Sequence, residues 1–219
     1  MNRKLNQGFT LIEIAIVLVI IGLLLGGVLK GQELINSAKV KNLATDFRNI
    51  PLYIYGYQDK FKALPGDDAR VATNMAGATL ATTPASSQGN GVIDGLWIPA
   101  TPATDETSLF WQHVRLAGLA AGATAPADPN YQPRNTDGGR IGIASGGSSP
   151  ITGLTGTYII CSEGLLGKYV KQLDITMDDR DTATGSMRAR GMANPTTPEA
   201  ATALASIVDS TSYIVCLGV

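Results

Sequence analysis

A single carboxylate lies within the most apolar part of the chain. Glu13 is the one charged residue between residues 9 and 29. A carboxylate inside a transmembrane helix costs about 2.5 to 3.5 kcal/mol on insertion scales, so such groups are usually paired or functional. If the chain is cut after Gly8, the new amine of Phe9 lies four residues before Glu13, on the same helix face. The cation that Glu13 needs could therefore come from its own chain or from a neighbouring one.

The segment around Glu13 has the length and flanks of a retained membrane anchor. Arg3 and Lys4 precede the apolar run and predict a cytoplasmic N-terminus. About 20 apolar residues span a hydrocarbon core, and residues 9–29 meet this length. An ordinary signal peptide has a small-residue cleavage site after its apolar part, and no such site follows residue 29. We therefore expect a leader at residues 1–8, a transmembrane segment at residues 9–29 and export of the rest.

The hexapeptide Gly8-Phe9-Thr10-Leu11-Ile12-Glu13, with its basic leader and apolar run, resembles the N-terminus of type IV pilins and type II secretion pseudopilins. The resemblance implies that a prepilin peptidase cuts between Gly8 and Phe9 and that the amine of Phe9 is methylated. It also implies that Glu13 pairs with the N-terminal amine of an adjacent subunit during filament growth. The implied partners are the prepilin peptidase, other pilin or pseudopilin subunits, an inner-membrane assembly platform and the membrane.

The composition fits an exported, mainly globular protein. The chain has 219 residues, a formal net charge of −1 and a pI near 5.8, which argue against nucleic acid as the main partner. One histidine, His113, excludes multi-histidine metal sites, and the sequence holds no nucleophile-elbow, Walker or dinucleotide motif. We therefore expect a protein that is not an enzyme.

The N-terminal helix is expected to cover residues 9–57, because apolar residues continue at helical spacing beyond the membrane segment. Pro51 removes a backbone donor within it and predicts a kink near Phe47. Residues 58–219 are then a periplasmic or extracellular head. The apolar stripe that carries this prediction consists of Leu43, Phe47, Ile50, Ile54 and Tyr57.

The head is expected to combine short strands with two helices. Strands are predicted at residues 140–144, 157–161, 186–190 and 212–217. Helices are predicted from Thr104 or Asp105 to Ala121, and from Glu163 to Leu173. Trp111 and His113 lie on the first of these helices and are interpreted as packing or surface residues. The fold class is α+β and pilin-like, with the long N-terminal helix packed on a small antiparallel sheet with long loops.

The only two cysteines, Cys161 and Cys216, each end a similar apolar stretch that is predicted to be a strand. In an oxidising compartment, and if the two strands are neighbours, a disulfide can join them with ordinary geometry. Pilin-like proteins often fasten their C-terminal region in this way, so the resemblance supports the pairing. Two buried free thiols are the alternative.

Two loops rich in Asp and Asn raise calcium as a possible cofactor, since hard cations take several carboxylate and carbonyl oxygens. Neither loop has the spacing of an EF-hand. Turns with solvated charges are the alternative that we favour, and no residue is assigned as a metal ligand. The first loop group is Asp67, Asp68, Asn90 and Asp94, and the second is Asp178, Asp179 and Asp181.

These features predict a structural subunit, a minor pilin or pseudopilin of a type IV pilus or a type II secretion-like filament. Major pilins often have a proline a little past mid-helix, where this chain has Lys30 and Gly31. The alternatives are a major pilin, or a membrane-anchored periplasmic binding protein or enzyme. Before assembly we expect a single-pass inner-membrane protein with a cytoplasmic N-terminus, and after assembly a periplasmic or cell-surface filament.

Overall fold

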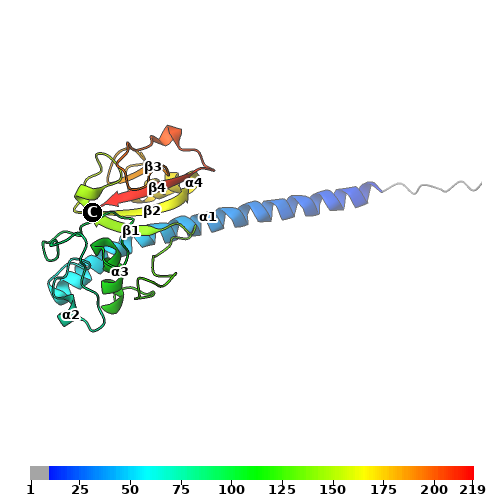
Figure 1. Ribbon diagram of the computed structural model, residues 1–219. Coiled ribbons are helices and arrows are strands. Elements are labelled where there is room, and N and C mark those ends of the chain that lie inside the picture. The colour runs from blue at the N-terminus through cyan, green and yellow to red at the C-terminus, as the bar shows by residue number, and fades with distance from the viewer. Residues whose placement is uncertain (1–9) are drawn as a thin grey trace, which may run out of the picture. The chain divides into compact units, whose positions relative to one another are not determined.

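The computed structural model describes residues 10–219 (Figure 1). Its contacts divide the chain into two compact units, Met1–Lys39 and Val40–Val219. Helix α1 (Leu11–Phe61) supplies the described helical part of the first unit and enters the second at residue 40. It ends four residues later than expected and continues through Pro51, so the kink near Phe47 stays a prediction.

The second part of α1 buries the predicted stripe. Each of its five apolar residues is at most 2% exposed. Their steps of three and four residues place them on one side of the helix, which is why this face can pack continuously against the rest of the unit. The amphipathic interpretation of this part of the helix is confirmed. The residues are Leu43, Phe47, Ile50, Ile54 and Tyr57.

The sheet has four antiparallel strands, as predicted. They are β1 (Ile141–Ser145), β2 (Tyr158–Leu166), β3 (Met187–Gly191) and β4 (Ser212–Gly218). Their order in space is β1-β2-β4-β3, so β4 lies between β2 and β3 (Figure 1). The α+β, pilin-like fold class is confirmed.

The helix predicted to begin at Glu163 is wrong at its start. Strand β2 continues to Leu166, and helix α4 is Gly167–Met177. A bulge between Ser162 and Leu165 lets the strand keep its pairing with β4, and Gly164 adopts a φ of +76° within the bulge. The apolar spacing at residues 163–166 suits either element, and the pairing partner on β4 decides between them.

Helix α3 (Glu106–Leu116) ends five residues before the expected Ala121. Gly118 has a φ of +77°, and the amides of Gly118 and Leu119 donate to the carbonyls of Arg115 and Val114. This is the Schellman arrangement that ends helices at a left-handed glycine. The remaining short helices are α2 (Val71–Asn74), η1 (Gly146–Ser148) and η2 (Leu204–Ser206).

The core lies on both faces of the sheet. One face packs against residues 40–54 of α1 and against α3 and α4 (Figure 1). The other face is covered by loops, which contribute Trp97, Ile151 and Leu154. Because both faces are covered, the strands are buried along most of their length.

Candidate functional site

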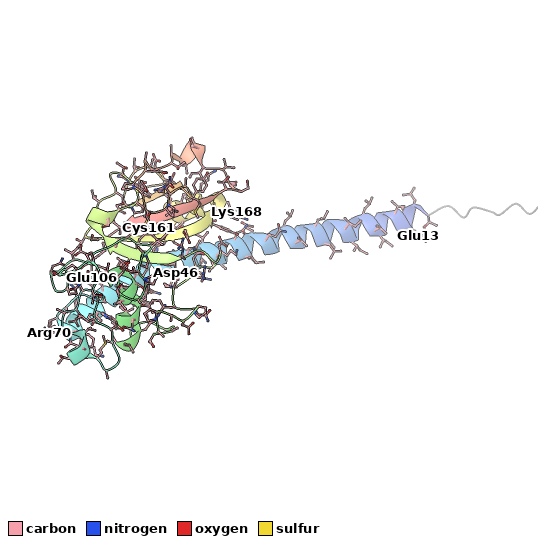
Figure 2. The ribbon with its side chains drawn as sticks, viewed as in Figure 1. Glu13, Asp46, Arg70, Glu106, Cys161 and Lys168 are labelled. Atoms are coloured by element: carbon pink, nitrogen blue, oxygen red, sulfur yellow. A yellow bond between two sulfur atoms is a disulfide. The ribbon has the colours of Figure 1, made fainter. Side chains whose placement is uncertain are left out.

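Glu13 lies in the first turn of α1 (Figure 2). It forms a reciprocal hydrogen-bonded arrangement with Thr10. Oε2 of Glu13 accepts from the backbone N–H of Thr10 at 2.7 Å and from its hydroxyl at 2.6 Å. The backbone N–H of Glu13 donates to Oγ1 of Thr10 at 3.3 Å. Gly8 and Phe9, the predicted cleavage and methylation residues, lie outside the described residues.

This arrangement is a capping box, in which an N-cap threonine and a glutamate three residues later satisfy amides that the helix cannot. The spacing Thr-x-x-Glu is visible in the sequence at Thr10 and Glu13. The sequence reasoning assigned Glu13 a charge-pairing role and missed Thr10. The structure therefore assigns Glu13 a role in beginning the helix, and its predicted charge pairing stays a prediction.

The part of α1 that lies in the first compact unit exposes apolar side chains on all of its sides. Its most apolar 18-residue window has a mean hydropathy of 2.8, and no residue of that window is buried. By length and composition, α1 can cross a membrane. A helix that is apolar all round needs lipid or other helices as its surroundings. The exposed residues include Leu11, Ile14, Leu18, Leu23 and Leu29.

A disulfide joins Cys161 of β2 to Cys216 of β4 (Figure 2). The two residues are direct cross-strand partners, with Cα atoms 4.1 Å apart, and both are fully buried. The bridge lies on the face of the sheet that packs against Trp97. The bridge therefore joins two neighbouring strands, β2 and β4, and β4 is the last strand in the sequence.

The first candidate calcium group serves as a loop organiser. The carboxylate of Asp67 accepts hydrogen bonds from the backbone N–H groups of Gly89, Asn90 and Gly91. The carboxylate of Asp68 accepts from the hydroxyl of Tyr57, the backbone of Arg70 and the amide of Asn74. Asn90 and Asp94 bond to each other at 2.7 Å. These contacts explain the Asx and glycine composition as turn formation.

Glu106 and His113 of α3 connect this loop to the helix. Oε1 of Glu106 accepts from the hydroxyl of Ser87 at 2.5 Å, and Oε2 accepts from the backbone of Asp94 at 2.7 Å. Burial, strengthened by the charges of Asp67 and Asp94, raises the pKa of Glu106 to about 7. The sequence reasoning gave Glu106 no role, because its burial depends on a loop distant in sequence.

His113 is a packing residue. It is fully buried, its Nδ1 accepts from the backbone of Gly66 at 2.9 Å, and its Nε2 lies 2.8 Å from the carbonyl of Thr79. Burial lowers the pKa of His113, and the carbonyl partner fixes the neutral ring with its proton on Nε2. Nδ1 thus holds the turn at Gly66, and Nε2 holds the backbone at Thr79.

The second candidate calcium group gains a member that the sequence reasoning missed. Asp174, on the last turn of α4, has a carboxylate oxygen within 4.8 Å of oxygens of Asp178 and Asp179. Asp181 is not one of the three grouped carboxylates. Its Oδ1 instead accepts a hydrogen bond from the backbone N–H of Ala183 at 3.1 Å. The four-residue spacing between Asp174 and Asp178 brings two side chains together on one helix face, and this spacing is the sequence signal that could have indicated Asp174.

Residues 3–29 match the family model of the prokaryotic N-terminal methylation motif. The chain carries a prepilin-type N-terminal methylation motif. This is consistent with the type IV pilin and pseudopilin family and points to a structural, membrane-anchored pilin-like protein that a prepilin peptidase processes and that assembles with other pilins. The match begins at residue 3 and includes the apolar part of α1. No curated protein and no solved structure matches the chain.

Proposed function

We propose that this pilin-like protein is a minor pilin or pseudopilin, a structural subunit of a type IV pilus or a type II secretion-like filament. The observation that carries the proposal is the methylation motif at residues 3–29, which includes the first part of α1, where the apolar side chains are exposed. Such a surface has to be covered by lipid before assembly and by neighbouring helices in a filament.

In this proposal residues 1–8 form the leader and residues 9–29 the membrane segment. A prepilin peptidase removes the leader between Gly8 and Phe9, and the amine of Phe9 is methylated. Arg3 and Lys4 keep the leader on the cytoplasmic side of the inner membrane. Residues 58–219 form the periplasmic or cell-surface head, while an inner-membrane platform assembles the processed subunits.

Assembly rests on Glu13 and on the new N-terminal amine of a neighbouring subunit. Both hydrogen bonds from Thr10 go to Oε2 of Glu13, which leaves Oε1 available to a cation as far as the described residues are concerned. A methylated amine at Phe9 is a cation of the right charge. Pairing then removes the cost of an isolated carboxylate in an apolar surrounding.

The preference for a minor subunit has two supports. The chain has Lys30 and Gly31 where major pilins often have a proline, and its head contains long loops between α3 and β1 and between β3 and β4. Major pilin is the second candidate. A membrane-anchored binding protein or enzyme is disfavoured because the motif points to a structural protein.

Processing is tested by the mass of the intact chain from a host that expresses the peptidase. We expect a chain that begins at Phe9 and carries one methyl group, and an uncut precursor when Gly8→Leu is introduced or when the peptidase is absent. A product that begins at Met1 in the presence of the peptidase, or one cut beyond residue 29, would contradict the proposal.

The subunit class is tested by quantifying the chain in sheared filaments against the most abundant subunit. A minor pilin is present at a small fraction of that subunit, whereas a major pilin is itself the bulk component. Absence from filaments of a host in which the chain is processed normally would leave the anchored binding protein as the better interpretation.

A further inference from the structure

One buried carboxylate of the head has no partner. Asp174 is 1% exposed, and neither Oδ1 nor Oδ2 has a hydrogen-bond partner among the described residues. Buried charges in proteins are normally paired, hydrogen-bonded or bound to a metal, because desolvation of an ionised carboxylate is expensive. The position of Asp174 therefore requires a cation or a proton.

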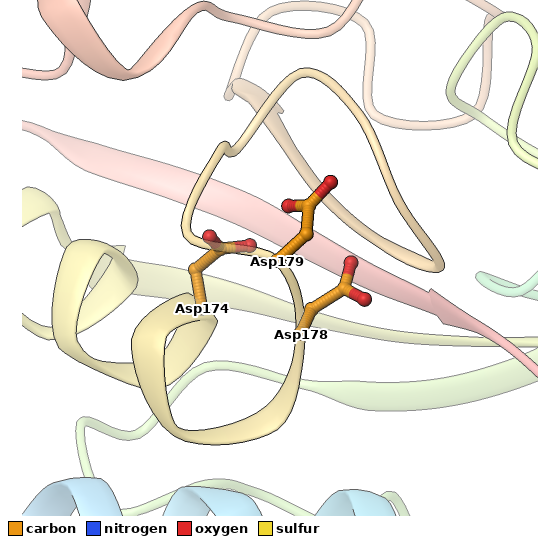
Figure 3. Close-up of side chains that lie close together, drawn as sticks. All are labelled: Asp174, Asp178 and Asp179. Atoms are coloured by element: carbon orange, nitrogen blue, oxygen red, sulfur yellow. The ribbon is translucent and has the colours of Figure 1, made fainter.

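The groups around Asp174 carry the same charge. Asp178 and Asp179 each place a carboxylate oxygen within 4.8 Å of Asp174 and of each other, around the turn that follows α4 (Figure 3). None of these three residues, nor Asp181, forms a salt bridge within residues 10–219. Four carboxylates within eight residues thus have no basic side chain bound to them.

The two neighbours are held in fixed positions. Asp178 accepts from the backbone of Met187 at 2.7 Å and from the hydroxyl of Ser186 at 3.1 Å. Asp179 accepts from the backbone of Asp181 at 2.9 Å and from the hydroxyl of Thr184 at 2.7 Å. Each carboxylate oxygen can accept more than one contact, so these bonds orient both groups and leave lone pairs for a cation.

We propose that Asp174, Asp178 and Asp179 bind one Ca²⁺ ion at the C-terminal end of α4. The available ligands are all hard oxygens, and the maximum spacing of 4.8 Å suits atoms that surround one ion at about 2.3 to 2.6 Å. Calcium tolerates the irregular geometry of a turn, whereas Mg²⁺ requires a near-ideal octahedron. The inference is independent of the filament function, since it rests on the head alone.

Protonation is the competing way to neutralise Asp174. Burial, together with the charges of Asp179, Asp178 and Asp181, raises the pKa of Asp174 to about 6. A proton and a calcium ion would therefore occupy the same carboxylate oxygens, and the metal titration decides between them.

The test is thermal unfolding and calorimetric titration of the full chain in detergent, with CaCl₂ added to metal-free protein. At pH 7.5 and a hundredfold excess over the dissociation constant, we expect the melting temperature to rise by about 5 °C or more. The rise should be smaller with MgCl₂, which requires a near-ideal octahedron. A wild-type chain that neither binds nor is stabilised by CaCl₂ at pH 7.5 would overturn the proposal.

Substitutions separate binding from folding. Asp174→Asn should melt no lower than the wild type without calcium, because it removes a buried charge, and should bind calcium at least about tenfold more weakly. Asp179→Asn, at an exposed position, gives the same loss of binding with little risk to the fold. Asp209→Asn, which only breaks the pair with Lys171, is the matched control and keeps the response. Equal calcium responses in all three variants would also overturn the proposal.

Discussion

At the scale of single residues, Glu13 caps the helix and, in our proposal, pairs with an amine; an alanine substitution removes both functions at once. Glutamine also serves as the third residue of a capping box, so Glu13→Gln retains the helix start but removes the charge. We expect both Glu13→Ala and Glu13→Gln to insert at least as well as the wild type and to enter filaments poorly, because neither can pair with an amine. Incorporation into sheared filaments, in a strain without the native copy, measures this.

The matched control is Thr10→Val, which removes the hydroxyl of the cap and leaves the carboxylate. If charge pairing drives assembly, Thr10→Val should assemble better than Glu13→Gln. The opposite order would show that Glu13 acts mainly as a cap. Normal assembly of Glu13→Gln would remove the charge from the mechanism altogether.

Because of Glu106, we expect the free energy of unfolding of the head to depend on pH. Its pKa is raised to about 7 by burial, above the ordinary 4.5, so its contribution to stability is fully present below pH 4.5 and is lost as the pH rises through 7. Glu106→Gln can still accept from the backbone of Asp94, and its amide can donate to Ser87, whose hydroxyl already reaches the carbonyl of Pro84 at 2.8 Å. We expect the variant to gain on the order of 2 kcal/mol relative to wild type between pH 5 and pH 8.

The measurement is the free energy of unfolding of both proteins across this range. The difference between the two curves should grow with rising pH, since only the wild type acquires a buried charge. Parallel curves would mean that Glu106 keeps an ordinary pKa in the folded state.

At the scale of elements, the disulfide ties β2 to β4 at directly opposite residues. The cysteines are 55 residues apart, and chain-entropy estimates for a loop of this size give roughly 4 kcal/mol of stabilisation before any native strain is subtracted. Protein made in the periplasm and denatured without reductant should expose no reactive thiol. Reduction should expose two per chain and lower the melting temperature.

A matched variant is Cys161→Ala combined with Cys216→Ala, which removes the bridge without leaving free thiols. It should resemble the reduced protein in its melting temperature. Two reactive thiols in the unreduced, denatured protein would contradict the bridge, and an unchanged melting temperature after reduction would contradict its stabilising role.

Some helices and strands of this fold can be predicted from local sequence pattern, and some of their boundaries cannot. The stripe of α1 and the positions of four strands follow from periods of 3.6 and 2, which a sequence displays directly. The boundary between β2 and α4 does not follow from such a period. Residues 163–166 belong to the strand because Leu165 and Leu166 pair with Tyr213 and Ser212 of β4. In the same way, the end of α3 depends on the left-handed Gly118, which the helical apolar spacing conceals.

At the scale of the whole molecule, the candidate sites differ in how much of each can be predicted from sequence. The N-terminal site is contiguous, so its residues and spacing are visible together, although the cap at Thr10 was overlooked. The cluster at Asp174 is nearly contiguous, but what distinguishes it is burial, which arises only when α4 packs on the sheet. Glu106 depends on contacts with a loop that precedes α3, which no local pattern can show.

The place of β4 in the sheet has a consequence for the timing of folding. It pairs with both β2 and β3, yet it is the last of the four strands to emerge from a ribosome or an export channel. Until residues 212–218 arrive, β3 has no neighbour and β2 pairs only with β1. The sheet therefore stays unfinished until almost all of the chain has been made. In the export that we propose for the head, an unfinished sheet keeps the chain extended enough to cross the membrane. Only then can the sheet close and the cysteines meet.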